Sequence, residues 1–278
     1  MESKRGSGTF VIYDPARPSA TGKTIGVIST YLDSYIFPSI IKGIEAILTQ
    51  QGYTMQLMLT HNQIENETRA LLSMLDNQVD GLIVEPTKSG LPNPNLPYYR
   101  QLQETGVPVI FFNACYPELS FPCVAMDDHL AGKRATEYLI GQGHLDIAGI
   151  FQSDDRQGHL RYAGYLEALN EGGAQVKSSL VTWFQTEESE TVITENPRLQ
   201  ALLNQCTAVL CYNDSIALTL YQQCREWGIK IPEDLSIIGI DNSELATLAD
   251  PPLTSVAHPS EALGQKTAEQ LLALLKDP

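Results

Sequence analysis

The feature that most constrains this chain is the repeated alternation of short apolar runs with longer amphipathic segments. Residues 24–29 (TIGVIS) form a nearly continuous apolar run, which is typical of a strand buried on both faces of a parallel sheet. In the next segment Ile40 and Ile44 recur on one helical face, Pro38 suits a first helical turn, and Gly52 suits a helix end. The pattern therefore predicts right-handed βαβ units.

The same alternation continues to the end of the chain. We expect further strands at residues 53–59, 81–84, 107–112, 147–151, 208–212 and 235–240. The helical periodicity predicts helices at about 65–77, 99–104, 129–141, 160–169 and 260–275, with one more ending near 227–228. Because there are more βαβ units than a single sheet usually holds, the sequence predicts an α/β protein with two doubly wound parallel-sheet lobes.

Polar side chains follow the predicted strands, where ligands bind in doubly wound folds. They are Thr30, Tyr31, Glu85, Lys88, Asn113, Asp154, Asp155, Asn213, Asp214, Asp241 and Asn242. Carboxylates and amides hydrogen-bond hydroxyl groups, and aromatic rings cover C–H surfaces, so the set suits a small polyol or sugar. For any single Asp or Asn, capping the next helix or forming a turn is an equally good interpretation.

Composition excludes several classes of protein. The formal net charge of −15 opposes binding of these residues to a phosphate backbone. Five cysteines without a CxxC pair indicate reduced thiols rather than disulfides or a zinc site. No apolar run approaches the ~20 residues that cross a membrane, and the first 13 residues lack the apolar core of a signal peptide. We expect a cytoplasmic protein with no membrane contact.

Catalytic motifs are missing from the sequence. Ser29, Ser153 and Ser215 do not stand in a Gly-x-Ser-x-Gly elbow. The five histidines lack metal-ligand spacing, and neither GxGxxG nor a Walker A motif is present. We therefore predict no enzyme activity, no catalytic residue, no cofactor and no metal.

Four stretches resemble the effector-binding domain of the LacI family. They are residues 124–150, 161–165 (RYAGY), 211–218 (CYNDSIAL) and 231–256, which ends in ADPPLTSV. The resemblance runs from residue 24 to the C-terminus and implies a type I periplasmic-binding-protein-like fold with a ligand cleft between the lobes. It also implies a homodimeric transcriptional repressor that responds to a sugar. Asp128 departs from the family, which usually has Asn there, so its role stays open.

A narrower resemblance concerns three loops: residues 81–90 (GLIVEPTKSG), 111–119 (FFNACYPEL) and 151–165 (FQSDDRQGHLRYAGY). They are similar to the L-arabinose-responsive repressors, which join a GntR-type winged-helix head to a LacI-type sensor. This resemblance implies L-arabinose as the effector.

The N-terminal residues 4–11 (KRGSGTFV) read as a hairpin with a Gly-rich turn and resemble the wing that closes a GntR-type head. The alternative is a tag or an unrelated leader. With the wing interpretation, residues 1–13 are a wing remnant, 14–23 a linker and 24–278 the effector-binding domain, and DNA is contacted only through the missing head. We expect an N-lobe at about 24–122 plus a helix at about 258–274, a C-lobe at about 146–253, and a crossover region at 123–145.

Matching positions in the family imply individual ligand-binding residues. Arg161 would present a planar fork of donors to adjacent hydroxyls, and the alternative is an ion pair with Asp154 or Asp155. Asp241 and Asn213 match positions that contact sugar hydroxyls.

The remaining candidates have weaker arguments. They are His258, Glu85, Lys88, Tyr31, Tyr35 and Asp155. His258 could equally be structural, and Glu85 with Lys88 could form a surface salt bridge in a Pro-rich loop. Phe37 suits either stacking or the core. Asp127 and Asp128 are expected to cap the following helix.

Two functions from different classes fit this fold. In the first, the sugar bridges both lobes of a repressor, stabilises their closed arrangement and weakens operator binding. In the second, the chain is an extracytoplasmic sugar-binding protein of a transport system. The signal-peptide analysis, the cysteines and the wing-like start favour the first.

Overall fold

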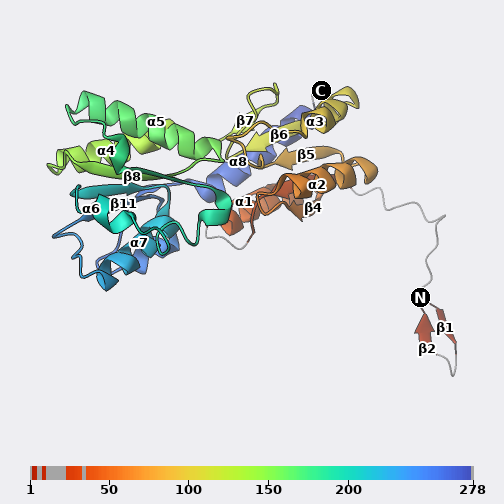
Figure 1. Ribbon diagram of the computed structural model, residues 1–278. Helices are drawn as coiled ribbons and strands as arrows, with labels where there is room; N and C mark the ends of the chain where they lie inside the picture. Colours follow the sequence, from red (N-terminus) through yellow and green to blue (C-terminus); the bar gives the residue numbers. More distant parts are fainter. Residues whose placement is uncertain (1, 5–7, 11–22, 33–35, 277–278) are drawn as a thin grey trace.

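Two α/β lobes make up the body of the protein (Figure 1). The computed structural model describes residues 2–4, 8–10, 23–32 and 36–276. Each lobe contains a five-stranded, fully parallel sheet, with strand order β4-β3-β5-β6-β7 in the N-lobe and β12-β11-β10-β8-β9 in the C-lobe. This architecture confirms the predicted fold class.

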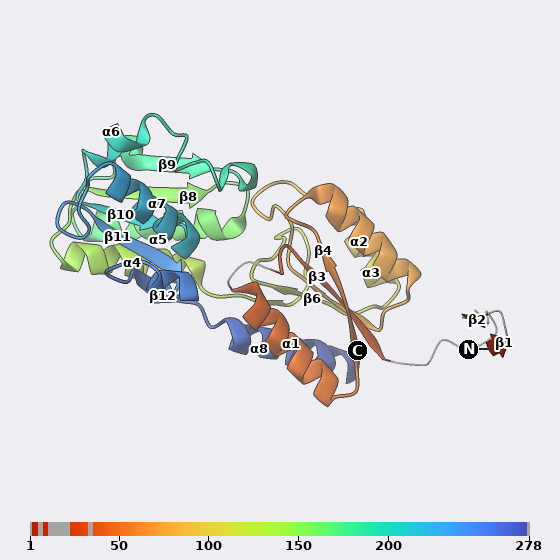
Figure 2. The same ribbon diagram turned by 90° about the horizontal axis from the view of Figure 1, so that it is seen from below.

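The N-lobe sheet is covered by two helices on each face. Its strands are β3 (Thr24–Ser29), β4 (Thr54–Leu59), β5 (Gly81–Val84), β6 (Val109–Phe112) and β7 (Cys123–Val124). Helices α1 (Phe37–Gln50) and α8 (Ser260–Lys276) lie on one face, and α2 (Ile64–Asp76) and α3 (Leu96–Glu104) on the other (Figure 2). Every residue of β5 and β6 is buried, as their apolar sequences require.

The C-lobe repeats this arrangement. Its strands are β8 (Ile147–Gln152), β9 (Val181–Phe184), β10 (Ala208–Cys211), β11 (Ser236–Asp241) and β12 (Thr254–Ala257). Helices α4 (Asp128–Gly141) and α5 (Arg156–Glu171) cover one face, and α6 (Leu199–Leu203) and α7 (Asp214–Glu226) the other. Three 3₁₀ turns complete the lobe, η1 (Ser178–Leu180), η2 (Thr186–Glu188) and η3 (Glu244–Thr247).

The chain passes between the lobes after β7 and again after β12. Helix α4 packs against α5, β10, β11 and β12, so it is part of the C-lobe. Of the predicted crossover region, only the residues between β7 and α4 therefore connect the lobes. The strands β9 and β12 were not among the expected elements, because both are short edge strands with half-exposed residues.

Each lobe holds one pair of helices whose backbones touch through glycines. In the N-lobe, a Cβ on Gly43 of α1 would lie 2.3 Å from the Glu261 carbonyl oxygen of α8. In the C-lobe, a Cβ on Gly132 of α4 would lie 2.1 Å from the Arg161 carbonyl oxygen, and one on Gly164 of α5 would lie 2.0 Å from that of His129. Only glycine permits these crossings.

Substituting Gly132 by alanine is expected to destabilise the protein by about 1–3 kcal/mol, because the new methyl group meets backbone that has no room to move. Gly141 in the same helix is the matched control, since a Cβ there meets no atom within 4 Å. Gly141→Ala is expected to be neutral or to stabilise by up to ~1 kcal/mol through helix propensity. Urea unfolding measures both; equal effects at the two positions would contradict the close crossing.

The N-terminal segment contains a small antiparallel hairpin of β1 (Glu2–Lys4) and β2 (Gly8–Phe10), in which Ser3 pairs with Thr9. The wing interpretation of this hairpin stays a prediction. Residues 11–22, which include most of the predicted linker, lie outside the described residues. Within the described part of the chain, no helix combines the length and the apolar character that crossing a bilayer requires.

Candidate functional site

A cavity of about 740 Å³ lies between the lobes, at the carboxyl ends of both sheets. Seven of the nine predicted ligand residues line it: Tyr31, Glu85, Asp155, Arg161, Asn213, Asp241 and His258. Lys88 lies beside the cavity, and Tyr35 lies outside the described residues. Parallel strands bring these residues together because their carboxyl ends meet at one edge of each sheet.

Arg161 is the centre of the C-lobe wall. It is 4% exposed, its Nε donates to Asp128 Oδ1 at 2.8 Å, and its Nη1 donates to the Tyr212 carbonyl at 2.6 Å. Its Nη2 lies 3.5 Å from Asp241 Oδ1. The expected alternative, a pair with Asp154 or Asp155, is wrong; the partners are Asp128 and Asp241. Although burial opposes the charge, these two carboxylates raise the pKa of Arg161.

The expectation that Asp128 caps the following helix is wrong. Only Asp127 caps α4, since its carboxylate accepts a hydrogen bond from the Leu130 amide at 2.9 Å. Asp128 turns inward to Arg161 and lines the cavity. Burial raises its pKa, and Arg161 partly offsets this effect.

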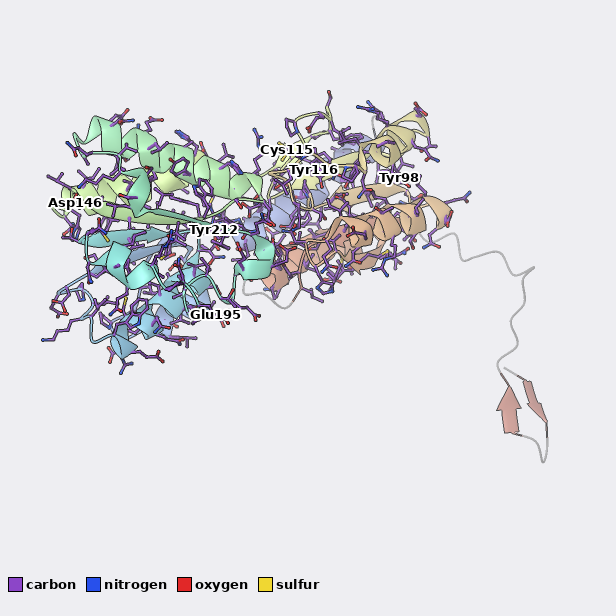
Figure 3. All side chains as sticks on the ribbon, in the orientation of Figure 1. Tyr98, Cys115, Tyr116, Asp146, Glu195 and Tyr212 are labelled. Atoms are coloured by element: carbon purple, nitrogen blue, oxygen red, sulfur yellow. The ribbon has the colours of Figure 1, made fainter. Side chains whose placement is uncertain are left out.

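Asp155 combines a capping role with a place in the cavity wall. Its Oδ1 accepts from the Gly158 amide at 2.7 Å at the start of α5, and the Tyr212 hydroxyl donates to its Oδ2. Figure 3 shows Tyr212 on the side of the C-lobe that faces the N-lobe. Burial raises the pKa of Asp155 to about 7. This carboxyl group is therefore close to its titration point at neutral pH.

Glu85 follows β5 and is the buried acid of the N-lobe wall. Its carboxylate accepts from the Thr30 amide at 2.8 Å, the Thr30 hydroxyl and Asn113 Nδ2 at 2.9 Å. Burial raises its pKa, and these donors lower it in part. Asn113 Oδ1 is buried and has no hydrogen-bond partner among the described residues, which leaves a polar acceptor in the cavity wall.

Aromatic rings form an apolar part of the N-lobe wall. Tyr31 makes edge contacts with Phe37 at 5.8 Å and with His61 at 6.4 Å between ring centroids. Burial, assisted by the charges of Asp154 and Glu85, raises the pKa of Tyr31 to about 12. Its hydroxyl is therefore neutral and can donate, while the rings offer a surface for C–H groups.

Two further predicted residues lie on the C-lobe side of the cavity. Asn213 Oδ1 accepts from the Ile216 amide at 3.0 Å and so caps α7, which leaves its amide NH₂ as the cavity donor. His258 lies where the chain leaves β12, with Nδ1 2.8 Å from Ser260 Oγ. Burial and the charge of Arg161 lower the pKa of His258 to about 4. Its ring is neutral at pH 7.

Lys88 joins the two lobes. Its Nζ lies 3.2 Å from Asp154 and 2.6 Å from Glu187, both in the C-lobe. The competing interpretation, a surface salt bridge with Glu85, is wrong, because Glu85 points to Thr30 and Asn113 instead.

Acidic side chains outnumber basic ones in the cavity wall. The acidic residues that line it are Glu85, Asp128, Asp155, Glu187, Glu190 and Asp241. Among the described residues that line it, Arg161 is the one permanent cation, and Asp128 and Asp241 already balance it. An anionic ligand would therefore be repelled.

Sequence reasoning missed several lining residues, among them Asn62, Gln152, Phe184, Thr186 and Tyr212. Gln152 ends β8 and Tyr212 follows β10, so the strand-end rule could have found both. Phe184 ends β9 and Thr186 lies just after it, and the apolar pattern did not predict this strand.

Comparison with known proteins identifies close relatives. A family model described as "Periplasmic binding protein-like domain" matches residues 136–278. The chain is similar to the "Arabinose metabolism transcriptional repressor" of Halalkalibacterium halodurans, with 38% identity over 98% of this chain and 74% of that protein. The protein of the same name from Geobacillus stearothermophilus is also 38% identical, over 98% of this chain and 76% of its own length.

Solved structures agree with these sequence matches. The transcription regulator CcpA of Lactococcus lactis superposes with a TM-score of 0.80 at 28% identity, covering 92% of each chain. A complex of the transcriptional regulator CelR with cellobiose gives a TM-score of 0.78 at 26% identity, covering 91% of this chain and 78% of that one.

Proposed function

We propose that this chain, which belongs to the LacI family of transcriptional repressors, is the domain through which one such repressor senses L-arabinose. It has the two-lobed effector domain of that family, which binds sugars. The observation that carries the proposal is the cavity between the lobes, where a fixed arginine, carboxylates, amides and aromatic rings face one another. The 38% identity to two arabinose metabolism repressors supports the choice of sugar.

The chemistry of the cavity favours a neutral polyhydroxylated ligand. Carboxylates that are already hydrogen-bonded within the wall, such as Asp128 and Glu85, hold their remaining lone pairs toward hydroxyl donors. The Arg161 guanidinium is held rigid by its partners and can share its fork of donors with adjacent hydroxyls. The excess of acids opposes sugar phosphates and sugar acids.

A sugar that contacts both walls stabilises the closed arrangement of the lobes. The sugar shifts the equilibrium between the open and closed arrangements only to the extent that it binds the closed one more tightly. In a homodimer, this change would alter the spacing of two DNA-reading heads and release the operator. We place this repressor in the cytoplasm, with L-arabinose, a second copy of the chain and operator DNA as its partners. Sedimentation should give a dimer, whereas a monomer would favour a transport-type sugar binder.

Calorimetric titration tests the ligand directly. We expect saturable one-site binding of L-arabinose, at least about tenfold tighter than D-ribose, D-xylose or D-galactose, because misplaced hydroxyls leave buried polar groups unpaired. D-Ribose 5-phosphate is expected not to bind. Binding of a different sugar would retain the sensor but overturn L-arabinose, and binding of the phosphate ester would overturn the charge argument.

A further inference from the structure

The loop after β5 crosses to the C-lobe and touches it through several contacts. We call residues 86–90 (PTKSG) the strap. In addition to the ion pairs of Lys88, the Gly90 amide donates to the Asp154 carbonyl at 3.2 Å, and the Arg156 amide donates to Ser89 Oγ at 3.0 Å. All of these contacts are between protein groups and need no ligand.

The contact at Gly90 is a close one. A Cβ on this residue would lie 2.9 Å from the carbonyl carbon and oxygen of Asp155 and 3.0 Å from its amide nitrogen. Because these are backbone atoms, a side chain at position 90 cannot be accommodated without separating the strap from the C-lobe.

Asn62 ties the strap to both lobes. Its Oδ1 accepts from the Lys88 amide at 2.7 Å, and its Nδ2 donates to Thr186 Oγ1 of the C-lobe at 2.6 Å. Lys88 has a φ of +44°, a left-handed conformation that costs free energy for a residue with a side chain. The hydrogen bond to Asn62 and the two ion pairs hold it there.

A buried carboxylate, that of Glu67, hydrogen-bonds to the strap and to the residues that follow it. Glu67 of α2 is 0% exposed and accepts from four side-chain donors and one backbone amide. The donors are Tyr116 OH at 2.7 Å, Tyr99 OH and Asn95 Nδ2 at 2.8 Å, Asn93 Nδ2 at 2.9 Å and the Thr87 amide at 3.4 Å. The hydroxyl oxygen of Tyr116, a residue labelled in Figure 3, also lies 2.7 Å from the Thr87 carbonyl oxygen. Glu67 thus connects the first and last parts of residues 87–95.

We propose that the strap is a latch that holds the lobes together without ligand, and that Glu67 is its positioning residue. The latch sets the fraction of molecules that are closed before a sugar binds. The observed dissociation constant is the intrinsic constant divided by this fraction, so weakening the latch lowers affinity through residues that need not touch the sugar. The affinity consequence rests on the proposed function; the latch itself does not.

Hydrogen exchange of the unliganded full chain tests the latch. The readouts are the peptides that contain the Gly90 and Arg156 amides, which are protected by contacts between the lobes. Gly90→Ala and Lys88→Gln are each expected to speed exchange in both peptides by about 3- to 10-fold. Gly141→Ala and Lys42→Gln are the matched controls, since Gly141 meets no atom within 4 Å and Lys42 pairs with Glu261 inside the N-lobe. Unchanged exchange in both test variants would overturn the latch.

Glu67→Gln separates positioning from mere stability. Glutamine has the same shape, but its NH₂ cannot accept from the Asn93 and Asn95 amides. We expect faster exchange at Gly90 in this variant at a temperature well below its unfolding transition. A lower unfolding temperature with normal exchange at Gly90 would overturn the positioning role. Should this variant not fold, Gly90→Ala and Lys88→Gln still decide the latch.

Titration with L-arabinose gives the second readout. Gly90→Ala is expected to weaken binding about as much as it speeds exchange, because both depend on the closed fraction. Faster exchange with unchanged affinity would overturn the latch as a control on binding. If the unmodified protein binds none of the sugars, the proposed ligand fails, and the exchange experiment still tests the latch.

Discussion

Replacing Arg161 by methionine is expected to destabilise the protein by about 3–5 kcal/mol and to abolish sugar binding. The side chain is 4% exposed and its guanidinium contacts both Asp128 and Asp241. Methionine fills much of the volume but leaves two buried carboxylates without the charge that balanced them. Breaking a buried ion pair on one side is costly for this reason, even where the intact pair contributes little net stability.

Urea unfolding at pH 7 measures the stability change. Lys42→Met is the control, because Lys42 is 69% exposed and pairs with Glu261 on the surface of α1 and α8, so its loss should leave stability almost unchanged.

The double variant Arg161→Met, Asp128→Asn separates stability from binding. Removing one of the two stranded carboxylates should restore part of the stability, whereas sugar binding should stay lost because the donor fork is gone. A single Arg161→Met variant that folds and still binds the sugar would show that Arg161 is purely structural.

The fold could be predicted because its signals are local. Runs such as TIGVIS and GLIVE are buried on both faces, and a glycine with positive φ follows several of the helices, as Gly52 follows α1 and Gly106 follows α3. The candidate site was largely predictable for the same reason, since residues that follow parallel strands meet at one edge of the sheet whatever the conformation of the loops. Asp155, Asn213 and Asp241 illustrate this rule.

What could not be predicted depends on contacts between distant segments. Asp127 and Asp128 both suit a helix cap by pattern, and only the position of Arg161, 33 residues further along the chain, assigns Asp128 to the interior. The bridge from Lys88 to Glu187 joins residues 99 apart and depends on how the lobes meet. No local periodicity encodes that arrangement. The edge strand β9 was missed because half-buried residues do not form a continuous apolar run.

The stability of an Asp155→Asn variant relative to the unmodified protein is expected to rise by about 3 kcal/mol between pH 5 and pH 8. The folded pKa of Asp155 is about 7, against an ordinary value of 3.8, because the group is buried. Between these values the native state binds a proton that the unfolded chain has released. The contribution of Asp155 to stability is therefore fully present below about pH 4 and is lost as the pH rises through 7.

Asparagine keeps the Gly158 cap and cannot ionise, so its contribution is independent of pH. The comparison must be made between variants, because His258 has the opposite effect in the unmodified protein. Its folded pKa of about 4 lies below the ordinary 6.5, so the unfolded chain takes up a proton first and stability falls as the pH drops from 6.5 toward 4. The two trends partly cancel in the total.

Unfolding curves at half-unit pH steps for the unmodified protein, Asp155→Asn and His258→Gln resolve these trends. The free energy of unfolding of Asp155→Asn minus that of the unmodified protein should increase toward high pH. The same difference for His258→Gln should increase toward low pH. If the unfolding free energy of Asp155→Asn relative to the unmodified protein does not change between pH 5 and 8, the Asp155 carboxylate is charged throughout this range. The Tyr212 hydroxyl and the Gly158 amide would then compensate its burial completely, and the wall beside Arg161 would carry a full negative charge at the pH at which a sugar binds.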